Sequence, residues 1–128
     1  MKIWHACLGF LFSACLPAAF ACGYCIEDKI AATYDHRVIT KAVSMGHAVA
    51  YAEIVGMPGL STAAEKEIAG IVEKVPGVDL GAVRISLETP ALSFAYDPRH
   101  FTSDSLLLQI NRNLAPQRVR VSLIRIIQ

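Results

Sequence analysis

Charged residues are scarce in this chain, and their signs are balanced. Only 18% of the 128 residues are Asp, Glu, Lys or Arg, and the formal net charge is +1. This balance excludes the basic surface that is typical of a nucleic-acid-binding protein. The hydrophobic fraction of 54% excludes an intrinsically disordered chain. We therefore expect one globular domain with no nucleic-acid partner.

The sequence also lacks the patterns of common catalytic sites. It contains no Ser-His-Asp order, paired carboxylates or phosphate-binding glycine loop in a suitable structural context. We therefore predict that the protein is not an enzyme, and we assign no catalytic residue. The four cysteines are the residues most suited to binding a metal or to redox chemistry.

The first 21 residues have the pattern of an export signal. Lys2 precedes a mostly apolar stretch over residues 3–16, and Ala19-Phe20-Ala21 has the A-x-A form of a signal-peptidase site. We expect cleavage after Ala21 and a periplasmic or secreted mature chain. An uncleaved anchor is the alternative, because residues 3–22 are nearly long enough to span a bilayer. Lipidation of Cys22 is less favoured, because a lipobox usually has Leu where Ala19 stands.

Cleavage at this site leaves only Cys22 and Cys25, which form a Cys-Gly-Tyr-Cys motif at the new N-terminus. The other two cysteines, Cys7 and Cys15, belong to the signal. Export implies an oxidising compartment, in which two nearby thiols can pair.

Hydrophobic periodicity predicts an N-terminal helix followed by a βαββαβ arrangement. Ile26, Ile30, Tyr34, Val38 and Ala42 recur every four residues and predict one helix over residues 26–44. Strands are predicted over residues 47–55, 83–87, 91–96 and 118–127. Helices are predicted from a Ser61 or Thr62 cap to about Lys74, with a Thr62–Glu65 capping box, and from a Thr102 or Ser103 cap to about Leu114. This order predicts a ferredoxin-like α/β (α+β) sandwich, with four antiparallel strands and two helices on one face.

Small side chains on the two central strands suggest where the N-terminal helix packs. One face of the first strand carries Ala48, Ala50 and Ala52, and one face of the third carries Ala91, Ser93 and Ala95. We expect these residues to form a shallow apolar trough that the helix 26–44 covers.

Four short motifs lie in order on the predicted elements between residues 48 and 127. In chain order they are Ile54-Val55-Gly56-Met57 at the end of a strand, Val75-Pro76-Gly77-Val78 after a helix, Ala95-Tyr96-Asp97-Pro98 at the end of a strand, and Leu106 to Ile110 within the last helix. On these motifs the chain resembles the heavy-metal-associated (HMA) domain family of copper chaperones and metal-ATPase modules. The resemblance implies an HMA-like domain over 47–128, preceded by the parts that the residues themselves indicate, a signal over 1–21 and a Cys pair with an N-terminal helix over 22–46. It also implies a heavy-metal ion as ligand and a metal-transport or other periplasmic protein as partner.

The family's metal-binding loop is altered in this chain. HMA domains bind metal through Gly-Met-x-Cys-x-x-Cys, in which two thiolates converge on one soft cation. The equivalent positions here are Gly59 and Thr62, which do not bind soft metals, and only Met57 of that motif remains. The family's metal site therefore cannot be assigned to this loop.

Three hypotheses for Cys22 and Cys25 remain open. In the first, the two thiolates bind a heavy metal, for which Cu(I) suits a two-ligand site better than Zn(II). His36, His47, Met45 or Met57 could complete the site, although each is individually more typical of an ordinary packed or surface residue. In the second, the pair is a structural disulfide in a metal-free interaction module. The third, thiol–disulfide exchange, is less favoured because no strand precedes the Cys pair.

Overall fold

The computed structural model describes residues 25–56 and 61–128, so the export signal, Cys22, Met57 and Gly59 lie outside the described residues. The elements follow in the order α1 (Ile26–Thr33), α2 (His36–Ser44), β1 (Ala48–Val55), α3 (Thr62–Glu73), β2 (Arg84–Ser86), β3 (Ala91–Tyr96), α4 (Ser103–Leu114), a short 3-10 helix (Ala115–Gln117) and β4 (Arg120–Ile127). From β1 onward this is the predicted βαββαβ order. No helix among the described residues has the length and apolar character needed to cross a bilayer.

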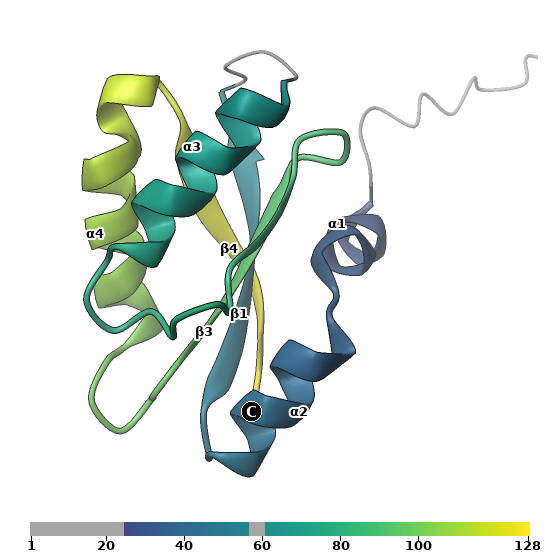
Figure 1. The fold of residues 1–128 in the computed structure, drawn as a ribbon, viewed down its shortest axis with the longest axis vertical. Coiled ribbons are helices and arrows are strands. Elements are labelled where there is room, and N and C mark those ends of the chain that lie inside the picture. Colours follow the sequence, from purple (N-terminus) through teal and green to yellow (C-terminus); the bar gives the residue numbers. More distant parts are fainter. Residues whose placement is uncertain (1–24, 57–60) are drawn as a thin grey trace, which may run out of the picture.

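The four strands form one antiparallel sheet between two helical layers (Figure 1). The strand order is β2-β3-β1-β4, which confirms that the first and third strands are central. Helices α3 and α4 lie on one side of this sheet, and α1 and α2 lie on the other (Figure 1). The prediction of a ferredoxin-like sandwich with an added N-terminal layer is therefore confirmed.

The larger core lies between the sheet and the α3–α4 layer. It contains fully buried aliphatic and aromatic side chains from both layers, including Ile68, Val72, Leu92, Phe94, Ile110 and Leu114. The apolar positions of both helices recur every three or four residues, so each helix buries one stripe against the sheet. This core gives the βαββαβ unit its main hydrophobic stabilisation.

A second core fills the space under α1 and α2. Ile30, Val38 and Ala42 pack with Val49, Tyr51 and Ala95 of the central strands. The expectation that the N-terminal segment covers this sheet face is therefore confirmed.

The predicted trough is only half correct, because the register places the alanines of β1 on the other face. Ala48, Ala50 and Ala52 pair with Tyr96, Phe94 and Leu92, in the core under α3 and α4. The small residues of β3 instead pair with Val49, Tyr51 and Glu53. The physical reason is complementarity of size, since each row of small side chains in one central strand faces large ones in the other.

The single helix predicted over residues 26–44 is wrong, since the chain breaks between α1 and α2. Tyr34 is extended, and the side chain of Asp35 accepts hydrogen bonds from the backbone N–H groups of Arg37 and Val38. Asp35 therefore caps a new helix instead of continuing the first. Of the predicted stripe, Ile30, Val38 and Ala42 are buried, whereas Ile26 and Tyr34 are exposed.

Three local differences complete the comparison with the predicted elements. Ser61 caps α3 by accepting from the backbone N–H of Ala64, so the predicted Thr62–Glu65 capping box is wrong. Strand β2 has only three paired residues, although Leu87 beyond its end is buried. A bulge in β4 opposite Tyr51 and Ala52 shifts the alternation of the last strand.

Candidate functional site

Cys25 lies immediately before α1 and is exposed. Its backbone is extended, as at a helix N-cap, and its carbonyl oxygen accepts a hydrogen bond from the backbone N–H of Lys29 at 3.1 Å. The side chain makes no capping hydrogen bond. Cys22, its predicted partner, lies outside the described residues.

Two ion pairs fix α1 against the sheet and so position Cys25. Lys29 Nζ lies 2.5 Å from Glu53 Oε2, and Arg125 Nη2 lies 2.9 Å from Glu27 Oε1. Glu53 is two residues from the end of β1, which leads toward the loop that holds the metal site in HMA domains. Cys25 is one helical turn from Lys29. It therefore lies on the α1 face of the sheet, while α3 lies on the opposite face.

Charged side chains of both signs follow Cys25. Glu27 and Asp28 lie in the first turn of α1. Arg125 Nη2 of β4 forms an ion pair with Glu27 Oε1.

The described residues just before and at the start of α3 are Ser61 and Thr62, which carry hydroxyl groups and no thiol. Thr62 is the first residue of α3 and is exposed, and Ser61 forms the helix cap. A hydroxyl group is a hard ligand that suits Cu(I) poorly. That this loop offers no soft-metal ligand at residue 62 stays a prediction from the sequence.

The additional candidate ligands that the structure describes are on or next to α2. His36 Nε2 lies 3.4 Å from Thr40 Oγ1 on the exposed side of α2, and Met45 is exposed at the end of that helix. His47 belongs to a polar network beyond α2, and Met57 lies outside the described residues. Across residues 25–56 and 61–128, no group of three or more His, Cys, Asp and Glu side chains is arranged to hold a metal ion.

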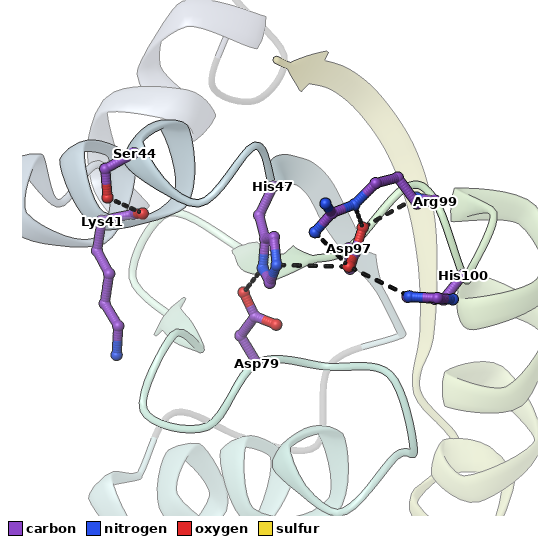
Figure 2. A network of polar contacts seen from close by, with 7 residues as sticks. All are labelled: Lys41, Ser44, His47, Asp79, Asp97, Arg99 and His100. Carbon is purple, nitrogen blue, oxygen red and sulfur yellow. Dashed lines mark hydrogen bonds and ion pairs between the residues drawn. The ribbon is translucent and has the colours of Figure 1, made fainter.

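The network around His47 joins three segments that are far apart in the sequence (Figure 2). Nδ1 of His47 lies 2.6 Å from Oδ2 of Asp79, so Nδ1–H donates to that carboxylate. Nε2 lies 3.6 Å from Asp97 Oδ2, and Arg99 donates to both oxygens of Asp97 at 2.9 Å. The hydrogen bonds from Arg99 hold the pKa of Asp97 well below its usual range.

Sequence reasoning missed this network, although Asp97 lies within one of the quoted motifs. His47 precedes β1, Asp79 follows α3, and Asp97 follows β3. The exposed His100 adds a more distant contact, with Nε2 at 3.8 Å from Asp97 Oδ2. The network fixes the end of the sheet opposite the loop after β1. No spacing in the sequence brings its members together.

Comparisons with known proteins support the fold and extend no further. No protein-family model matches the chain, and no curated protein is significantly similar to it. A copper binding domain from HMA7, a P-type ATPase, is similar in structure, with a TM-score of 0.50 and 12% sequence identity. The match covers 63% of this chain and 99% of that domain. The fold is that of the HMA domains. Because that domain is covered almost completely, more than a third of this chain lies outside the shared fold.

A second solved structure, oxidized MerP from Ralstonia metallidurans CH34, matches with a TM-score of 0.48 and 18% identity. That match covers 62% of this chain and 99% of the other.

Proposed function

We propose that this chain is an exported heavy-metal-binding or trafficking protein that holds Cu(I) between the Sγ atoms of Cys22 and Cys25. The observation that carries the proposal is the placement of the exposed Cys25 at the N-terminus of α1, on a domain with the HMA fold. The Cys-x-x-Cys spacing places two soft ligands before a helix, as in the family's own motif. The copper binding domain of the P-type ATPase binds its metal on the same fold.

Processing at Ala21 would add a further ligand to this pair. Cleavage there makes Cys22 the first residue, and its free amine becomes a third donor beside the two thiolates. The ion pairs from Lys29 and Arg125 join α1, which follows the Cys pair, to the sheet. We expect a metal-transport or other periplasmic protein to be the partner in transfer.

The test measures Cu(I) stoichiometry on the reduced, processed protein in competition with a coloured Cu(I) chelator. We expect about one Cu(I) per chain in the natural protein. Cys22→Ser and Cys25→Ser should each lose competition with the chelator. Thr62→Ser, at the altered loop before α3, should retain it and serves as the control.

The alternative is a metal-free interaction module in which Cys22 and Cys25 form a disulfide. It is favoured by the exposed Thr62 at the position of a family ligand. If the reduced natural protein binds no Cu(I), the metal proposal is wrong and this alternative replaces it. Thiol–disulfide exchange would instead require an oxidising potential for the pair, measured against glutathione.

A further inference from the structure

A pocket lies between α2 and the segment that leads into β2. Its volume is about 290 Å³, close to the lower end of the range for small-ligand sites. One wall is α2, the other is the segment 79–84, and Ala95 of β3 contributes to the floor. The pocket exists only because α2, which lies before the βαββαβ unit, covers this face of the sheet.

The α2 wall presents two basic side chains without an ion-pair partner among the described residues. Arg37 and Lys41 both line the pocket and are exposed, and four residues separate them, so they lie on one face of the helix. Neither side chain takes part in a hydrogen bond or ion pair within the described part of the chain. Figure 2 shows the Lys41 side chain extending away from the His47 network, without a contact to the residues drawn.

The other charged groups of the pocket are already engaged. Arg84 donates from Nε to Asp35 Oδ2 at 2.9 Å and from Nη1 to the carbonyl oxygens of Gly81 and Val83. Asp79 is the single acidic residue lining the pocket, and its carboxylate accepts the hydrogen bond from His47. Among the described residues, Arg37 and Lys41 are therefore the charged side chains of the pocket that have no partner, whereas Asp79 is held by His47.

The remaining lining is apolar. Val38, Ala42, Ala82 and Ala95 form a buried floor of small and branched side chains. At the rim, Met45 is 45% exposed and Leu80 is 85% exposed. Covering an exposed Leu side chain with an apolar ligand removes apolar surface from water and so favours binding.

The two walls are fixed before any ligand arrives. The backbone N–H of Asp79 donates to Ala95 at 2.8 Å, and that of Ala82 donates to Asp79 at 3.2 Å. The Arg84–Asp35 contact ties the same segment to the start of α2. A fixed pocket loses little entropy on binding, which favours affinity for a small ligand.

We propose that this pocket binds a small organic carboxylate with an apolar chain or ring. The carboxylate would bind between Arg37 and Lys41, and the apolar part would lie over Ala42 and Ala82 beneath Met45 and Leu80. The site is independent of Cys22 and Cys25, so it stands whether or not the protein binds a metal.

The test uses hexanoate, hexanol and hexylamine as matched probes of one chain length. Each is titrated into the isotope-labelled protein, and backbone amide shifts are followed by NMR. We expect hexanoate to shift residues 37–45 and 79–84 saturably, hexanol to bind more weakly, and hexylamine to cause no saturable shift there. Equal binding of hexylamine and hexanoate, or the absence of saturation with hexanoate, would overturn the proposal.

Three exposed-site variants separate the roles of charge and apolar contact. Lys41→Gln should weaken hexanoate binding by about tenfold, because it removes one of the two free cations. Leu80→Ser should weaken both hexanoate and hexanol, because it removes the apolar rim. Lys66→Gln removes the same charge from α3 on the opposite face of the sheet, and it should leave binding unchanged. Equal losses in Lys41→Gln and Lys66→Gln would show that only net charge matters and would refute the site.

Discussion

Arg84 donates from Nε to Asp35 Oδ2 at 2.9 Å, joining the edge strand β2 to the junction of α1 and α2. The other carboxylate oxygen of Asp35 caps α2 by accepting from the backbone N–H groups of Arg37 and Val38. One side chain therefore ends the first helix, begins the second and attaches both to the sheet.

The Arg84–Asp35 contact should make stability depend on pH in the acid range. The hydrogen bond from Arg84 is the main cause that lowers the pKa of Asp35, and the two backbone N–H groups add to it. A lowered pKa in the folded state means that the contact stabilises the fold above the ordinary carboxyl pKa. This stabilisation is lost as the pH falls through the folded-state pKa. We expect Arg84→Gln to move the acid-unfolding midpoint to higher pH, measured by circular dichroism. Arg112→Gln, an exposed residue of α4, should leave the midpoint unchanged.

The second core should contribute measurably to stability, and two isoleucines of α1 provide a matched test. Ile30 is 9% exposed and packs against the sheet, whereas Ile26 is 54% exposed. We expect Ile30→Ala to lower the free energy of unfolding by about 2–4 kcal/mol, because it leaves a cavity. Ile26→Ala should change it by less than about 0.5 kcal/mol. Equal losses in urea unfolding would mean that α1 is not packed on the sheet as described.

Glycine is required at residue 77, in the Val75-Pro76-Gly77-Val78 motif, and Gly70 provides the comparison. Gly77 has a φ of +104°, and a Cβ atom there would lie 2.7 Å from Cδ1 of Phe101. We expect Gly77→Ala to lower the free energy of unfolding by more than about 1 kcal/mol, through strain and the steric clash. Gly70 lies inside α3 with open space at the Cβ position. Gly70→Ala should raise stability by about 0.5–1 kcal/mol in the same thermal or denaturant measurement.

The Asp97 carboxyl group should report directly on its contact with Arg99. The hydrogen bonds from Arg99 are the main cause of the lowered pKa of Asp97. Replacing Arg99 with Gln should therefore raise this pKa toward the ordinary value of about 3.9, observed by NMR titration of the side-chain carboxyl carbon. Arg120→Gln, which alters the opposite end of the sheet, should not move it. An unchanged titration in Arg99→Gln would contradict the bidentate contact.

The βαββαβ order was predictable because each element carries a strong local signal. Ser61 and Thr102 cap their helices as the sequence suggests, and the apolar periods of α3 and α4 match the stripes that they bury. Gly56 and Gly77, which gave two of the motif cues, both adopt a positive φ. These signals depend on residues close in the sequence, so sequence reasoning could use them.

The errors arose where a distant residue decides the outcome. The four-residue apolar spacing runs through Asp35 without interruption, but Asp35 caps a new helix through one oxygen and accepts from Arg84, 49 residues later, through the other. The face assignment of β1 failed for a related reason. Alternation shows which residues of β1 share a face of the sheet. The pairing of Tyr51 with Ser93 is needed to show that Tyr51, and not the alanines of β1, lies on the same face as the small residues of β3.

The candidate site also combines local features, which the sequence predicts, with contacts between distant residues, which it does not. The Cys22–Cys25 spacing is local and could be proposed from the sequence, whereas the placement of Cys25 depends on the Lys29–Glu53 contact. The pocket beside α2 needs the helix break and the segment 79–84 to be in place together. It could not be predicted from either segment alone.

The ion pair between Glu27 and Arg125 joins residues 98 positions apart and has a consequence for how the molecule folds. The first helix is synthesised before every strand, yet one of its anchors arrives with the final strand, β4. Closing a loop of this length is slow, because the entropy loss precedes the contacts that compensate it. The Glu27–Arg125 contact, close to Cys25 at the start of α1, therefore cannot form until β4 has been synthesised.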